Sequence, residues 1–149
     1  MKLEAITRAK IWLLATVVIG FSFLNGCDGN WADAGVKLAN EIPAYALEQI
    51  KSHKILDENE KLIAYYDVSL PVDGSEATIL TNERVVYLKD DRSTSIKYDR
   101  IIDIKYTDEG WAGDTIVIKS SEGEWMKIVI AVANDGALLF DILKDSTRL

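Results

Sequence analysis

From residue 60 onward, apolar and polar residues alternate with a period of two, which is typical of strands that bury one face. Turn-forming residues interrupt the alternation at short intervals, most clearly at Asp73 and Gly74. Short strands joined by close turns are the pattern of an antiparallel sandwich or barrel. We predict seven strands, in KLIAYYDVSL (61–70), ATIL (77–80), RVVYLK (84–89), STSIKY (93–98), IIDIKYT (101–107), TIVIKS (115–120) and WMKIVIA (125–131).

Two further segments show the three- and four-residue spacing of amphipathic helices. We predict a helical segment over residues 31–54, with an apolar stripe that should rest on the sheet. Pro43 lies inside it, so either the helix kinks there or two helices meet. The chain closes with a second amphipathic helix, which Asn134 or Asp135 can cap. Its apolar stripe should plug the open end of the barrel, and it consists of Leu138, Leu139, Ile142 and Leu143.

The start of the chain has the pattern of an export signal. Residues 1–10 are basic, and residues 11–24, IWLLATVVIGFSFL, carry no charge. A helix over that run would be only about 21 Å long, whereas the hydrocarbon core of a bilayer is about 30 Å thick. The run is therefore short for a stable membrane span and suits the apolar region of a secretory signal.

The only cysteine directly follows this run. Leu24, Asn25, Gly26 and Cys27 resemble the lipobox of bacterial lipoproteins. That resemblance implies cleavage between Gly26 and Cys27 and attachment of diacylglycerol to the Cys27 thiol, with Asp28 favouring retention at the inner membrane. The alternative is an incidental cysteine behind an uncleaved anchor. The predicted organisation is a signal peptide over 1–26, a lipidated tether over 27–30, the helical segment over 31–54 and one domain over 58–149.

Composition narrows the possible functions. The chain has 149 residues, the length of one domain, and a net charge of −7. This charge argues against a nucleic-acid binder, which normally carries a basic patch, and against docking to anionic lipid by charge. With a single cysteine and a single histidine, an internal disulfide or a structural zinc site is not expected. A lipid anchor would therefore have to supply the membrane affinity.

Residues 58–147 resemble the small bacterial pleckstrin-homology-like (PH-like) domains. The likeness is clearest in ILTNERVVYLK (79–89), similar to an aliphatic-Thr-Asn-x-Arg hairpin of that family, and extends through SIKYDRIIDI (95–104) to Gly123. It implies a mainly β fold, a seven-stranded antiparallel barrel or sandwich capped by a C-terminal helix. Asn82 would occupy the hairpin turn with positive φ.

The best-known PH domains bind phosphoinositides through cations around the first hairpin loop. Here that loop, PVDGSE (71–76), has no Lys or Arg and contains Asp73 and Glu76. A phosphate pocket needs cations or converging backbone amides. We therefore expect no phosphoinositide binding.

The polar residues do not form a recognisable catalytic set. His53, the only histidine, is expected on the solvated surface. The carboxylates of DENE (57–60) and DEGWAGD (108–114) are expected to be solvated in loops. We therefore predict no catalytic residue, no metal site and no cofactor.

Trp111 is the candidate partner contact, because it lies mid-loop between Gly110 and Gly113. Either it folds over the barrel mouth, or it is an exposed aromatic anchor of the kind enriched at interface hot spots. We expect a non-enzymatic, lipid-anchored protein-binding or scaffolding module, facing the periplasm or exterior of a bacterial membrane. The alternative is a carrier or sensor of a small apolar or lipid ligand held in the barrel end.

Overall fold

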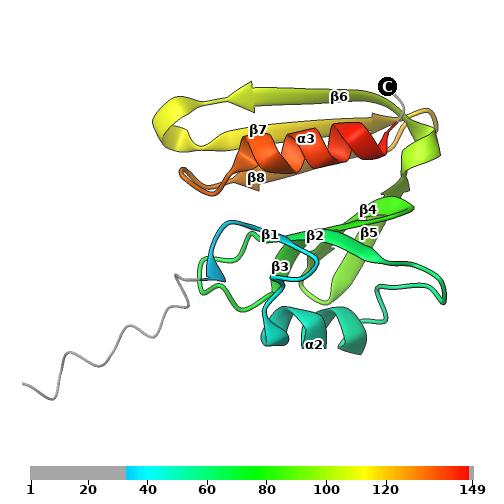
Figure 1. Ribbon diagram of the computed structural model, residues 1–149. Helices are drawn as coiled ribbons and strands as arrows, with labels where there is room; N and C mark the ends of the chain where they lie inside the picture. Colours follow the sequence, from blue (N-terminus) through cyan, green and yellow to red (C-terminus); the bar gives the residue numbers. More distant parts are fainter. Residues whose placement is uncertain (1–32, 148–149) are drawn as a thin grey trace, which may run out of the picture.

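The structure, a computed structural model, describes residues 33–147 and contains two antiparallel sheets (Figure 1). The seven expected strands are confirmed as β2–β8, and a short additional strand, β1, precedes them. The first sheet has the order β1-β2-β3-β4-β5 and the second β6-β7-β8. The strands are β1 (Val36–Leu38), β2 (Leu62–Asp67), β3 (Glu76–Thr81), β4 (Arg84–Lys89), β5 (Arg92–Lys97), β6 (Ile101–Asp108), β7 (Asp114–Ser120) and β8 (Trp125–Ile130).

Close connections join the strands from β2 onward within each sheet, whereas residues 39–61 separate β1 from β2. The chain passes from the first sheet to the second through one 3-10 turn, η2 (Tyr98–Arg100). Another 3-10 turn, η3 (Gly110–Ala112), lies in the loop between β6 and β7. Because every strand follows its neighbour along the chain, turn chemistry alone orders most of the topology.

The prediction of a helical segment over residues 31–54 is wrong for much of its described part. Helix α2 covers only Ala44–Ser52, and Pro43 stands at its N-cap with extended backbone angles. The proline therefore starts a single short helix and neither kinks a long one nor joins two. Residues Val36–Leu38 instead pair with β2, with Val36 opposite Tyr66. This pairing satisfies backbone groups at the edge of β2, a tertiary effect that helical spacing cannot reveal.

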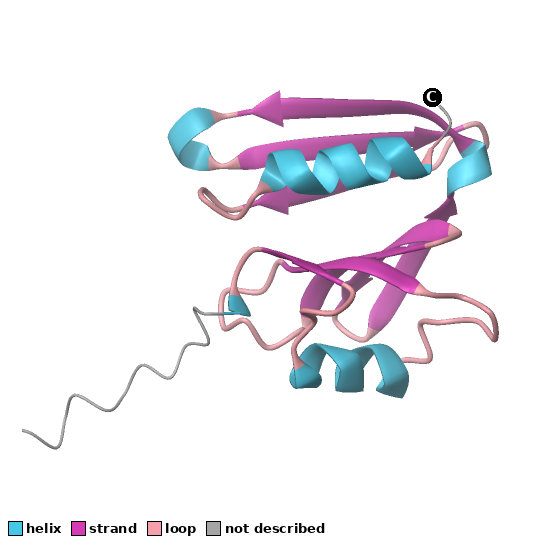
Figure 2. Ribbon diagram, in the orientation of Figure 1, coloured by secondary structure: helices cyan, strands magenta, loops and turns pink. Residues whose placement is uncertain are grey.

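Helix α2 covers the outer face of the first sheet, as its apolar stripe predicted (Figure 2). Ala46 and Ile50 are its buried residues, and they pack with Ile79 of β3 and Val86 of β4. This cluster forms a second, smaller core on the side of the first sheet that faces away from the second sheet.

The main core lies between the two sheets and helix α3 (Gly136–Ser146). Leu139 and Leu143 are fully buried and confirm the apolar face of α3, whereas Leu138 is 40% exposed and lies outside it. The predicted capping is wrong: Asp135 occupies the N-cap but its side chain makes no capping hydrogen bond. The Asn134 amide donates to the Tyr66 hydroxyl instead.

Candidate functional site

The structure describes some of the residues that the sequence predicted to be functional and leaves others outside its described range. Gly26 and Cys27 lie outside the described residues, as does the whole segment before residue 33. Trp111 is 91% exposed within η3, so it does not fold over the barrel mouth. Trp125, at the start of β8, is 70% exposed and belongs to the sheet surface.

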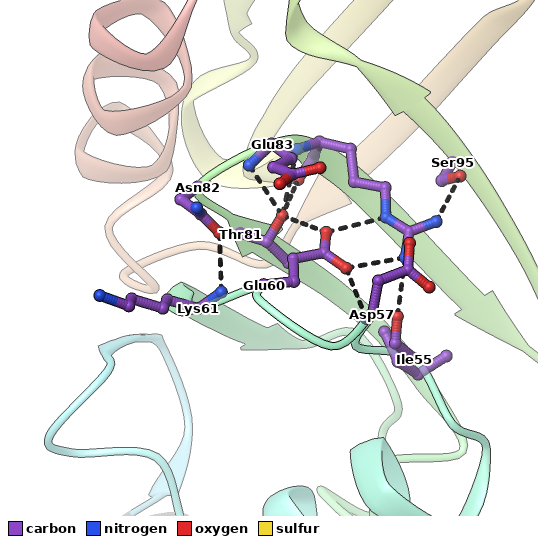
Figure 3. Close-up of polar contacts among 9 residues, drawn as sticks. Ile55, Asp57, Glu60, Lys61, Thr81, Asn82, Glu83 and Ser95 are labelled. Atoms are coloured by element: carbon purple, nitrogen blue, oxygen red, sulfur yellow. Dashed lines mark hydrogen bonds and ion pairs between the residues drawn. The ribbon is translucent and has the colours of Figure 1, made fainter.

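The hairpin between β3 and β4, which carries the Thr-Asn-x-Arg motif, is held by a buried ion pair (Figure 3). Arg84 donates to both carboxylate oxygens of Glu60, from Nε to Oε1 and from Nη2 to Oε2, at 2.8 Å each. Thr81 donates its hydroxyl to Glu60 Oε1 at 2.6 Å. The same Arg84 Nη2 also donates to the carbonyl of Ile55 and the carboxylate of Asp57.

Glu60 corrects the expectation that the DENE carboxylates are solvated. Its side chain is completely buried, whereas that of Asp57 is largely exposed. Hydrogen bonds from Arg84 lower the pKa of Glu60 to about 2, so the carboxylate is fully charged at neutral pH. A buried carboxylate with a depressed pKa and occupied oxygens cannot accept a proton during catalysis near neutral pH. Glu60 instead holds the loop 55–60 against the hairpin through its hydrogen bonds to Thr81 and Arg84.

Asn82 occupies the turn of this hairpin as predicted, but without positive φ. Its side-chain oxygen accepts a hydrogen bond from the backbone amide of Lys61 at 2.7 Å. Asn82 thus ties the start of β2 to the hairpin through its side chain. The turn therefore does not depend on the ability of asparagine to adopt a left-handed backbone conformation.

His53 is half-buried at the end of α2, not freely solvated as predicted. Its Nε2 lies 3.0 Å from Asp91 Oδ1 in the turn between β4 and β5. The pKa of His53 is raised chiefly by the hydrogen bond to Asp91, and to a smaller extent by the hydrogen bond to the carbonyl of Gln49. This pair fastens the C-terminus of α2 to the first sheet.

Asp67 organises the first loop after β2. Its carboxylate accepts hydrogen bonds from the Tyr45 hydroxyl at 3.0 Å and from the amides of Ser69 and Gly74 at 2.9 and 2.8 Å. The Tyr65 hydroxyl is also within reach, at 3.4 Å. Converging loop amides of this kind could otherwise hold an anion, but here they already bind the chain's own carboxylate.

A polar cleft of about 590 Å³ opens where three segments of the chain meet. The turn between β3 and β4, the η2 corner and the end of α3 form its walls. Its charged groups include Lys97, Glu83 and Asp99, so both signs are present. The Tyr98 hydroxyl donates to the carbonyl of Thr81 and supports the floor. The cleft is lined by Asn82, Glu83, Lys97, Tyr98, Asp99, Ile101 and Ser146.

A second, apolar groove of about 350 Å³ lies outside the barrel, between α2 and the start of β2. Leu47, Leu56 and Leu62 line it, together with Ile50. Lys51 and Lys54 also border it.

Within residues 33–147, no group of three or more His, Cys, Asp or Glu side chains is arranged to hold a metal ion. Among the helices of the same residues, none combines the length and apolar character needed to cross a bilayer.

Two solved structures of bacterial proteins resemble this architecture. The pleckstrin homology domain from Shewanella amazonensis SB2B superposes with a TM-score of 0.53 at 16% sequence identity, over 70% of this chain and 88% of the other. The chain has a PH-like fold. A DUF1696 family protein with a pleckstrin-homology domain from Shewanella loihica PV-4 gives a TM-score of 0.55 at 14% identity, over 76% and 98% of the two chains. No protein-family model and no curated protein matches the sequence.

At 14–16% identity, the likeness to these two structures shows the fold of this chain alone. Sequence reasoning missed two of the polar residues described above, the buried Glu60 and Asp67, whose carboxylate accepts hydrogen bonds from the loop that follows β2. Asp67 lies between Tyr66 and Val68, so the available signal was an acidic residue inside the apolar strand predicted over 61–70. The polar cleft had no such signal, because its three segments are far apart in sequence.

Proposed function

We propose that this chain is a lipid-anchored, non-enzymatic protein-binding module of the bacterial cell envelope, with the polar cleft as its partner site. The observation that carries the proposal is the position of the cleft at the end of an open strand edge. Within the described residues, β5 pairs with β4 on one side and with no strand on the other. Lys97, the last residue of β5, lines the cleft.

An extended partner segment can use both features at once. Main-chain pairing with an exposed strand edge supplies affinity without demanding a particular sequence. Residues Arg92, Ser93 and Thr94 of β5 are exposed and present short or flexible polar side chains. The cleft then adds specificity, because Lys97 and the acidic pair Glu83 and Asp99 select complementary charges.

Strand β2 has no free edge, because β1 pairs with it on one side and β3 on the other. Helix α2 covers a face of the first sheet and leaves its edges open. Of the two edge strands of the first sheet, β1 has only three residues and β5 has six, so β5 offers the longer edge to an added strand.

The anchor is proposed on the sequence alone. Gly26 and Cys27 supply the cleavage position and the thiol of a lipobox, and two or three acyl chains hold a protein stably on a membrane. Asp28 favours retention at the inner membrane. In a Cys27→Ser variant we expect loss of processing and of membrane association, measured by intact mass and by fractionation. Continued processing and membrane retention would contradict the anchor.

The partner site is tested by site-specific crosslinking in intact cells. A photo-crosslinking amino acid at Thr94, Lys97 or Asp99 should capture the same partner, while the same group at Lys127 on the exposed surface of β8 should not. A charge-reversing Lys97→Glu variant should lose that crosslink, with Lys127→Glu as the matched control. Equal capture at all positions, or none at the cleft, would contradict the proposed site.

The alternative function, a carrier of an apolar or lipid ligand, has one observation in its favour, the apolar groove beside α2. The barrel end expected to hold such a ligand is occupied by side chains, since Ile116, Ile128 and Leu143 are fully buried. A ligand would therefore have to bind between Leu47 and Leu62. Native mass spectrometry of the purified full chain should detect a bound lipid that a Leu62→Asp variant lacks.

A further inference from the structure

The described chain begins at one end of the barrel, among three loops (Figure 1). A Cβ built on Gly35 would lie 3.9 Å from Asn134 in the loop between β8 and α3. The amide of Ala131 in that loop donates to the Tyr66 hydroxyl at the end of β2. We call this end, consisting of residues 33–35 and the loops 68–75, 109–113 and 131–135, the tether end.

The loop between β6 and β7 belongs to the same end. A Cβ built on Gly113 would lie 2.2 Å from the carbonyl oxygen of Ile130, so this loop packs directly against the last residue of β8. The loop after β2 adjoins as well, because it begins two residues after Tyr66, whose hydroxyl accepts the hydrogen bond from the Ala131 amide.

Each loop of the tether end exposes a large apolar side chain. Leu70 is 90% exposed in the first loop, Trp111 is 91% exposed in η3, and Val132 is 59% exposed before α3. The opposite end of the barrel carries the polar cleft, and Trp125 lies there at the far end of β8. The tether end of this small acidic domain thus carries three exposed apolar side chains, one on each loop.

The length of chain between the anchor and the barrel limits which surface can be that partner. Asp33 lies only six positions after Cys27, and a fully extended chain of six residues spans at most about 20–22 Å. Strand β7 alone is about 20 Å long. An anchor at Cys27 therefore keeps the tether end within about 20 Å of the bilayer surface.

We infer that the tether end docks onto the bilayer that holds the lipid anchor, with Leu70, Trp111 and Val132 at the level of the headgroups. This inference rests on the proposed lipidation of Cys27. Tryptophan favours the membrane interface, where its apolar ring and polar nitrogen are both accommodated. The anchor makes the contact intramolecular, so three small apolar contacts suffice where they would not hold a free protein. The polar cleft then faces away from the membrane, open to a protein partner.

The charged residues of the tether end determine on which lipids, and at which salt concentration, its contact with the bilayer is favoured. Exposed Asp73, Asp108, Glu109 and Asp135 surround the apolar tips, and they oppose approach to anionic lipid. Such repulsion between exposed charges is largely screened beyond about 10 Å at 0.1 M salt. On anionic vesicles the contact should therefore tighten as salt is added, whereas on zwitterionic vesicles it should barely change.

The test uses the full chain purified from bacterial membranes and placed in phosphatidylcholine vesicles that contain spin-labelled lipid. A lipidated Cys27 has no free thiol, so an introduced cysteine is the only site for a thiol-reactive fluorophore. Labels at Leu70→Cys, Trp111→Cys and Val132→Cys should lose most of their fluorescence to the spin-labelled headgroup region. A label at Trp125→Cys, the matched tryptophan at the other end of the sheet, should lose little, as should one at Asp99→Cys.

The parent chain separates failure of the inference from failure of the anchor. If its Cys27 reacts with the fluorophore, the proposed lipidation is wrong. If Cys27 is blocked but the labels at positions 111 and 125 are quenched equally, or position 125 more strongly, the tether end does not dock and the inference is overturned. Restored fluorescence at position 111 in a Leu70→Ser/Val132→Ser background would support docking through the three tips together.

Discussion

The guanidinium of Arg84 holds the buried carboxylate of Glu60 through two parallel hydrogen bonds of 2.8 Å. This relationship joins a loop before the barrel to the hairpin that carries the family-like motif. It explains why the motif marks the fold: its threonine and arginine are the residues that bind Glu60. Removing one member of a buried ion pair leaves the charge of the other uncompensated, and this change lowers stability most.

The first prediction concerns this pair. Arg84→Met should lower the free energy of unfolding by about 3–5 kcal/mol, because the Glu60 carboxylate would remain buried and unpaired. Arg100→Met is the matched control, since Arg100 pairs with Glu122 and both side chains are about half exposed. The control should cost less than about 1 kcal/mol. Urea denaturation measures both, and similar losses would contradict a special role for the buried pair.

The second prediction concerns acid. The pKa of Glu60 falls from an ordinary 4.5 to about 2 in the folded protein, chiefly through its bonds to Arg84. The resulting stabilisation is fully present above pH 4.5 and is lost as the pH falls toward 2. It amounts to something on the order of 3 kcal/mol. The difference in unfolding free energy between the parent chain and Glu60→Gln, followed from pH 7 to 2, should shrink across this window. A constant difference would show that the pKa of Glu60 is not lowered in the folded protein.

The third prediction compares two buried threonines. Among the described residues, Thr78 has a buried hydroxyl with no hydrogen-bond partner. Thr81, three residues along, donates to Glu60 and accepts from the amides of Glu83 and Arg84. Thr78→Val should therefore stabilise the protein by about 1 kcal/mol, whereas Thr81→Val should destabilise it by about 1–3 kcal/mol. Thermal unfolding of the two variants should give shifts of opposite sign, and shifts of the same sign would contradict the assignment.

The fourth prediction concerns the loop that presents Trp111. Gly113 has a φ of 97° and a ψ of −152°, and an added Cβ would meet the carbonyl oxygen of Ile130. Gly123 also has positive φ, but an added Cβ there meets no atom within 4 Å. Gly113→Ala should cost about 3 kcal/mol or more, because clash and strain combine, and Gly123→Ala only about 1–2 kcal/mol. Equal effects in chemical denaturation would show that the loop does not pack as described.

Local pattern was sufficient for most of the fold. The alternation in residues such as Met126, Ile128 and Ile130 marked strands, and the spacing of Leu139 and Leu143 marked the closing helix. The same local reasoning failed for residues 36–38, where helical spacing was overridden by pairing with β2. It also failed for Glu60, because only the fold brings Arg84 within reach of that loop.

What the sequence determined by itself was the set of strands β2–β8, their order through close turns, and the closing helix. These depend on neighbours within a few positions along the chain, and such patterns are visible in the sequence. Tertiary structure alone decided that Glu83, Lys97 and Ser146 line one cleft, and that Leu70, Trp111 and Val132 lie at the same end. Those groupings arise from the folding of distant segments onto one another, and no local spacing encodes them.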